Sequence, residues 1–130
     1  TSQYSYVQGV QEDTSGIELP VRHVAPSFGN THLIWKRNNL QLDGFISYNG
    51  TLGSSDISNE LANYLFALDS DGNPYAPSWY TLNARARFDL NSSVSFVGTL
   101  ENITNQRYRT YSSGITSPGT NFIAAITYTF

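Results

Sequence analysis

Four residues near the C-terminal end interleave cations with aromatic rings, namely Arg107, Tyr108, Arg109 and Tyr111. An arginine guanidinium donates paired hydrogen bonds to carboxylate or phosphate-like groups, which makes it a common residue of anion-binding sites. One hypothesis is that this segment captures a ligand or closes over it. The alternative, which we favour because ligand-binding loops vary with their ligand, is a packing motif that holds one loop on its neighbour.

A second charged set lies within segments that alternate apolar and polar residues, and it consists of Arg85, Arg87 and Glu101. If these segments are strands, the charged side chains share one face, and a charged face is costly in lipid. These residues would then line a wet or filled lumen. They would either contact a domain that fills the lumen or form an ion-pair network among themselves, and the second interpretation is the simpler one.

Enzymatic and metal chemistry have little support in the residues. The two histidines, His23 and His32, fall on different expected elements without a third partner, which argues against a zinc site or a catalytic triad. There is no cysteine, so disulfides and thiolate sites are excluded. The stretch from Asp69 to Pro74 lacks the spacing of a calcium loop and predicts a turn. We therefore predict no catalytic residue, no metal site and no cofactor, and a protein that is not an enzyme.

Composition narrows the class of protein further. The 130 residues carry seven basic and ten acidic side chains, a net charge of −3 that gives no basic surface for nucleic acid. No apolar run approaches the roughly 20 residues of a membrane-spanning helix. The chain contains no methionine and begins with Thr1, so we expect it to be a piece of a longer polypeptide.

Period-two alternation of apolar and polar residues is the main structural signal, and it predicts six β-strands. In the last of them, Asn121 to Phe130, every second residue from Phe122 onward is apolar. Each clear segment is close to the roughly 9–11 residues of a tilted membrane strand. The other expected strands run from Tyr4 to Gly9, Gly29 to Lys36, Leu40 to Tyr48, Trp79 to Phe88 and Val94 to Glu101.

The connections between these strands alternate in length. Those at 10–27, 50–77 and 103–119 are long, whereas those at 37–39 and 90–93 are tight. Long loops on one side and short turns on the other are typical of outer-membrane β-barrels. Within the 50–77 connection we expect one short helix from Ser58 to Ala67, capped by Asp56, with Leu61, Tyr64 and Leu65 on one face.

Aromatic residues mark both ends of the apolar faces. Between them these faces carry leucine, isoleucine, alanine and glycine, which is typical of an apolar band with an aromatic girdle at each membrane boundary. Ile34 and Phe45 fall on the opposite, polar face and weaken the pattern. The expected girdle residues are Trp35, Phe88 and Phe130 beside the short turns, and Tyr48, Tyr80 and Phe122 beside the long loops.

Several motifs resemble those of TonB-dependent outer-membrane receptors. The run Pro77 to Asn83 resembles their third-from-last strand, and Leu100 to Tyr108 is similar to a "GxENLxDxxY" signature that leads into the last extracellular loop. Residues Tyr111 to Ile115 and Pro118 to Phe122 resemble that loop and its return. The amino-acid sequences at residues 73–79 and 108–115 most resemble those of receptors from Bacteroidetes-type bacteria. In one departure from the family, Thr120 stands where an arginine is frequent.

The resemblance implies an all-β protein in the bacterial outer membrane, in which residues 1–130 form the last six strands of a 22-stranded antiparallel barrel. Such receptors import iron-siderophore, haem, cobalamin, glycan or peptide ligands. The implied partners are outer-membrane lipid, the rest of the barrel with its plug, the TonB complex reached through that plug, and the barrel assembly machinery. The implied assembly signal consists of Phe122, Ile126, Tyr128 and the terminal Phe130.

Two competing classes remain open at this point. A soluble antiparallel sandwich, such as an extracellular binding module, would also show alternation, glycine and tyrosine, and it would bury Phe122, Ile126 and Phe130 in a core. A barrel enzyme would need a histidine with serine or aspartate at its rim, and neither histidine is suitably placed.

Overall fold

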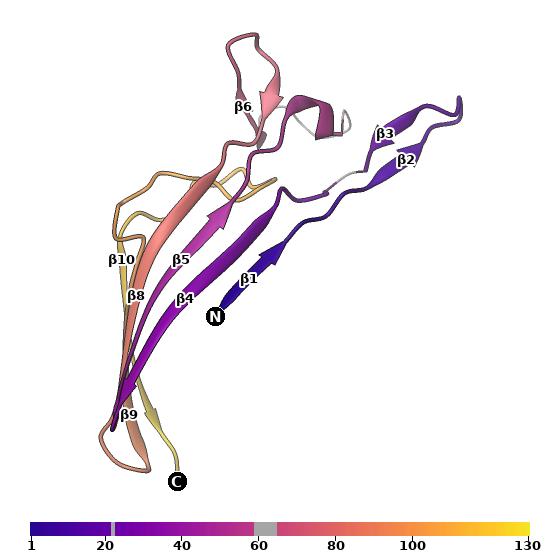
Figure 1. Ribbon diagram of the computed structural model, residues 1–130. Helices are drawn as coiled ribbons and strands as arrows, with labels where there is room; N and C mark the ends of the chain where they lie inside the picture. The colour runs from indigo at the N-terminus through magenta and orange to yellow at the C-terminus, as the bar shows by residue number, and fades with distance from the viewer. Residues whose placement is uncertain (22, 59–64) are drawn as a thin grey trace.

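The alternating segments form one six-stranded antiparallel sheet in the order β1-β4-β5-β8-β9-β10 (Figure 1). The computed structural model describes residues 1–21, 23–58 and 65–130. The strand order follows the chain, so the sheet is an up-and-down meander. Its strands are β1 (Ser2–Ser5), β4 (Phe28–Arg37), β5 (Leu40–Asn49), β8 (Trp79–Asp89), β9 (Val94–Glu101) and β10 (Asn121–Tyr128).

The five later strands confirm the sequence prediction to within two residues at each end, but the first strand is displaced. It was expected from Tyr4 to Gly9, whereas β1 pairs Ser2 with Thr31 and ends at Ser5, opposite Phe28. Continued pairing would require the residues before β4, where Pro26 has no backbone N–H to donate. The chain therefore leaves the sheet after Ser5.

Short turns join the strands at one end of the sheet, where Figure 1 also shows the C-terminus. The β4–β5 turn contains Asn38, whose φ of 51° lies in the left-handed region that asparagine tolerates. In the β8–β9 turn, the Asn91 side chain accepts hydrogen bonds from the backbone N–H groups of Ser93 and Val94 at 2.9 Å. The predicted alternation of short and long connections is confirmed.

The three long connections lie together at the other end of the sheet (Figure 1). The first contains the hairpin of β2 (Val10–Glu12) and β3 (Glu18–Pro20). The second contains the 3₁₀ turn η1 (Ser54–Asp56) and the hairpin of β6 (Ala67–Leu68) and β7 (Pro74–Tyr75). Neither hairpin was predicted from alternation, because strands of two or three residues are too short to show it.

The short helix expected from Ser58 to Ala67 falls mainly on residues 59–64, outside the described residues, and these include Leu61 and Tyr64. At its two ends the prediction is wrong, because Asp56 belongs to η1 and Ala67 opens β6. Among the described residues there is no helix long and apolar enough to cross a membrane.

The two loop hairpins have tips with the same design. In each, an aspartate side chain accepts hydrogen bonds from backbone N–H groups two and four residues later: Ser15 and Ile17 for Asp13, and Asp71 and Asn73 for Asp69, at 2.8–2.9 Å. A glycine three residues after each aspartate has a positive φ, 77° at Gly16 and 83° at Gly72. Each tip is therefore a rigid Asp-x-x-Gly turn. This arrangement agrees with the turn predicted at Asp69 to Pro74.

The small apolar core lies among the long connections and not against the sheet. Its buried members come from the second connection, and Leu65 and Tyr111 pack against them. No second sheet covers the six strands in the part of the chain that the structure describes. A β-sandwich would bury one face of its sheet, so the single layer argues against that alternative. The core residues are Leu52, Ile57, Phe66 and Ala76.

Candidate functional site

One face of the sheet is apolar and exposed across all five long strands. The strand register aligns apolar residues with one another, for example Ile46 with Leu82 and Ile126 with Phe96. Phe122 is 68% exposed and Ile126 is 72% exposed, although both residues are large and apolar. A continuous apolar surface of this extent marks contact with a membrane or a partner.

Aromatic pairs lie at both ends of this apolar face. Tyr48 is directly opposite Tyr80 at the end near the long connections, and the Tyr48 hydroxyl donates to the Gln3 carbonyl at 3.4 Å. Phe88 is opposite Phe96 near the short turns. Residues between these pairs are aliphatic or small. The arrangement fits the expected girdles, because amphipathic rings favour a lipid–water boundary.

The opposite face is polar, and most of the buried polar side chains among the described residues lie on it. Because successive side chains of a strand point to opposite faces, this polarity follows from the same alternation that makes the first face apolar. The buried polar residues of this face are Asp43, Thr81, Asn83, Ser95 and Thr99.

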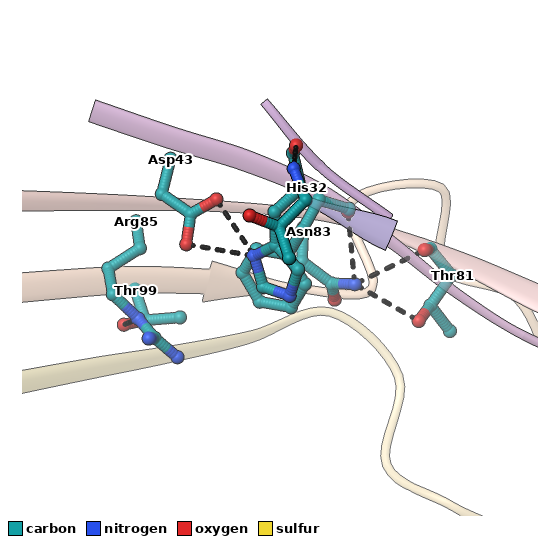
Figure 2. A network of polar contacts seen from close by, with 8 residues as sticks. His32, Asp43, Thr81, Asn83, Arg85 and Thr99 are labelled. Atoms are coloured by element: carbon teal, nitrogen blue, oxygen red, sulfur yellow. Dashed lines mark hydrogen bonds and ion pairs between the residues drawn. The ribbon is translucent and has the colours of Figure 1, made fainter. Parts of the chain in front are cut away.

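A connected group of side chains crosses the polar face from β4 to β9, as Figure 2 shows. The His32 Nδ1 atom lies 3.0 and 3.1 Å from the two carboxylate oxygens of Asp43. The His32 ring stacks on the Phe45 ring, with 4.8 Å between the ring centroids. The Arg85 guanidinium lies 5.4 Å from the centroid of the Phe45 ring. Arg85 Nε donates to the Thr99 hydroxyl at 3.3 Å. Phe45, an exception in the sequence pattern, is thus covered by polar neighbours.

The three charged residues predicted for this face are all on it, but each has different neighbours. Arg87 forms an ion pair with Asp89 at 2.8 Å, and Arg85 contacts Thr99 and Phe45. Glu101 lines a cavity of about 250 Å³ under the last connection. No ion pair joins these three residues to one another within the described chain. Contact with a plug stays a prediction.

Asn102 organises the start of the last long connection, a role that sequence reasoning missed. It is only 3% exposed and has a positive φ of 49°. Its side-chain amide donates to the carbonyls of Gln106 and Pro118 at 2.9 and 3.2 Å, and its side-chain oxygen accepts from the Gln106 N–H at 2.8 Å. The motif around Asn102 was visible in the sequence, but its bonding partners were not.

The two tyrosines of the predicted loop site pack on neighbouring elements. The Tyr108 ring lies 4.2 Å from the Trp79 ring of β8, and the Tyr111 ring lies 6.0 Å from Phe66 of the loop core. Burial raises the pKa of the Tyr111 phenol above its ordinary value. These contacts agree with the alternative interpretation, in which the segment is a packing motif that holds the last loop on its neighbours.

The two arginines of the same segment have no hydrogen-bond or ion-pair partner for their side chains among the described residues. Arg107 and Arg109 line a cavity of about 270 Å³ between the last connection and the β6–β7 region. The predicted loop residues therefore lie together, but they separate into packed tyrosines and unpaired arginines.

Three of the four residues expected to form the assembly signal lie on one face of β10, and the fourth follows the strand. Phe122, Ile126 and Tyr128 belong to the apolar face, and Phe130 follows the strand with its ring 5.9 Å from that of Tyr128. Phe130 is fully exposed at the short-turn end. This places the Phe130 ring beside the short-turn end of the apolar face, and its role in assembly stays a prediction.

No family model and no curated protein matches the chain. Two solved structures do, each over 99% of this chain. One is described as the copper transporter OprC, with a TM-score of 0.78 and 10% identity. The other is the ferric enterobactin receptor PfeA in complex with BCV-L6, with a TM-score of 0.67 and 14% identity. The chain spans 20% of the length of either structure.

The TM-scores show a shared fold, and at sequence identities of 10% and 14% the similarity shows the fold alone. The chain folds as a segment of each of these two proteins does, so the antiparallel all-β fold expected from the resemblance to TonB-dependent receptors is confirmed. Closure of these strands into a 22-stranded barrel stays a prediction.

Proposed function

We propose that this chain is the C-terminal part of an outer-membrane receptor that imports a large, scarce nutrient. It supplies the last six strands of a closed barrel, for which the family resemblance implies 22 strands in all. The single observation that carries this proposal is the two-faced sheet: Ile126 and its apolar neighbours are exposed on one face, whereas Asp43 and Arg85 lie on the other. Lipid accepts only the first face, and a filled lumen accepts only the second.

The open edges of the sheet support the need for further strands. β1 and β10 each pair on one side only, which leaves backbone N–H and C=O groups unpaired. Such groups cost several kcal/mol each in lipid, so a closed barrel must satisfy them. The remaining barrel strands and a plug are therefore the first proposed partners. The TonB complex, the barrel assembly machinery and outer-membrane lipid follow from the resemblance.

The proposed role is transport and not catalysis, with a ligand from the iron-siderophore, haem, cobalamin or glycan classes. The matches to a copper transporter and a ferric enterobactin receptor support a carrier in general. The amino-acid sequence of the loop motifs supports an origin in Bacteroidetes-type bacteria. Within this function, Arg107 and Arg109 are proposed to contact ligand at the cell surface, and Tyr108 and Tyr111 are proposed to hold the segment that carries them.

The proposal is tested directly by determining on which side of the outer membrane the long connections and the short turns lie. The chain has no cysteine, so single cysteines report without interference from this segment. Ile115→Cys places a thiol in the last long connection, where the side chain is 79% exposed, and Ser92→Cys places one in a short turn. We expect a membrane-impermeant maleimide to label Ile115→Cys on intact cells. Ser92→Cys should react only after the outer membrane is permeabilised, and equal labelling on intact cells would refute the proposal.

A further inference from the structure

The last long connection carries its two arginines beside a cavity, while its Tyr108 ring packs on β8. Arg109 forms an antiparallel bridge with Thr116, and the Ser117 N–H donates to the Tyr108 carbonyl at 2.9 Å, so the backbone is extended at Tyr108 and Arg109. Successive side chains of an extended segment point to opposite sides. Tyr108 is turned toward Trp79, so Arg109 lies on the other side, and Arg107 and Arg109 line the same cavity.

The cavity beside these arginines has a consistent chemical character. Among the described residues its lining contains no aspartate or glutamate, so Arg107 and Arg109 are the charged groups that face it. Aromatic residues supply part of the remaining wall, including Phe66, Tyr75 and Tyr111. Two cations without counter-ions, next to aromatic surface, fit an anionic ligand that carries an apolar body.

We propose that Arg107 and Arg109 form an oxyanion-binding pair, and that this cavity binds a ligand carrying carboxylate or phosphate groups on an aromatic body. Two residues apart on an extended chain, their Cα atoms are separated by about 6.5 Å, which allows both guanidinium groups to reach one anionic head. Tyr108 and Tyr111 are positioning residues that hold the segment on Trp79 and Phe66. The proposal deepens the proposed function and rests on it for placing the cavity at the cell surface.

The test uses the full-length protein that contains this chain, in lipid nanodiscs, with benzoate and phenyl phosphate as probes and benzamide as the neutral analogue of benzoate. Saturation-transfer NMR of the probe gives the dissociation constant. We expect the double variant Arg107→Gln, Arg109→Gln to bind benzoate and phenyl phosphate about tenfold or more weakly. The variant Arg107→Lys, Arg109→Lys should be intermediate, because lysine keeps the charge and loses the paired geometry.

The double variant Lys36→Gln, Arg37→Gln is the matched control, since it removes two cations from the exposed end of β4 at the short-turn side. It should leave binding of both anionic probes unchanged. Two results would overturn the proposal: unchanged benzoate and phenyl phosphate affinity in the double glutamine variant, or equal affinity for benzamide and benzoate. The maleimide labelling tests the proposed function, and the NMR experiment tests the anion site. Because the two measurements are independent, failure of the proposed function and failure of the anion site can be distinguished.

Discussion

Asn83 on β8 accepts a hydrogen bond from the backbone N–H of Asn102 at 2.9 Å, and through it the polar face of the sheet anchors the last long connection. Both residues are buried. The Asn83 amide in turn donates to the Thr81 hydroxyl at 3.2 Å, a bond drawn in Figure 2. The loop that carries the proposed anion site is thereby fixed at its base to the six-stranded sheet.

Replacing Asn102 should release this loop. Asn102→Ala loses the side-chain bonds to Gln106 and Pro118 and places alanine at a positive φ, so we expect a destabilisation of about 2–4 kcal/mol. Asn102→Gly keeps the backbone conformation without strain, and its cost should be about 1 kcal/mol smaller. Hydrogen exchange of the Gln106 and Ser117 amides measures the local opening. Parent-like protection in both variants would contradict the anchoring role.

Two neighbouring alanines on β10 offer a matched test of the two faces. Ala124 lies opposite Gly98 on the apolar face, and Ala125 lies opposite Val97 on the polar face. Ala124→Arg should cost about 2–4 kcal/mol, because arginine near the middle of the bilayer is poorly solvated. Ala125→Arg should be close to neutral. Equilibrium unfolding from lipid vesicles gives both values, and the reverse order would mean that the faces are assigned the wrong way round.

Gly29 is required where β1 docks on β4. A Cβ at this position would clash with the Gln3 carbonyl oxygen and the Tyr48 hydroxyl. Gly29→Ala should therefore detach β1, seen as faster hydrogen exchange at the Gln3 amide. Gly44→Ala is the control, since an added Cβ there meets no atom within 4 Å. If both variants exchange alike, the close approach of Tyr48 over Gly29 is not needed for pairing.

The β6–β7 turn should weaken in acid. Hydrogen bonding, first of all from the Asn73 backbone N–H, lowers the pKa of the Asp69 carboxyl below its ordinary value of 3.8. A lowered pKa in the folded state adds stability that is complete above the unfolded value and is lost as pH falls through the folded one. We expect steady Asn73 amide protection from neutral pH down to about pH 4 and loss below it. Asp69→Asn should remove this pH dependence, and an unchanged profile in that variant would exclude the carboxylate as its cause.

Alternation was sufficient to predict β5, β8 and β9, because period two is a local property that each strand shows within its own residues. It could not locate β1, whose length is set by where its partner β4 begins after Pro26. It also could not find the role of Asn102, whose partner Asn83 is distant in the chain. The Asp13 and Asp69 turns are local and readable from an Asp-x-x-Gly pattern.

The sequence predicted which residues form the candidate site, but it could not predict which of them pack and which stay unpaired. Sequence spacing grouped Arg107, Tyr108, Arg109 and Tyr111. Whether each residue packs or stays free depends on Trp79 and Phe66, which come from other elements, so only the folded chain separates the tyrosines from the arginines.

The chain's two tryptophans provide the most direct measurement, because they lie on opposite faces of the sheet. Trp35 is on the apolar face and 49% exposed, whereas Trp79 is on the polar face with its ring against Tyr108. The full-length protein is reconstituted in lipids brominated near the head group, and the Trp35→Phe and Trp79→Phe variants isolate each contribution to the fluorescence. We expect bromolipid to quench the Trp35 component and to leave the Trp79 component unchanged. Quenching of Trp79, or an unquenched Trp35, would show that the apolar face does not contact lipid and would contradict the proposed barrel.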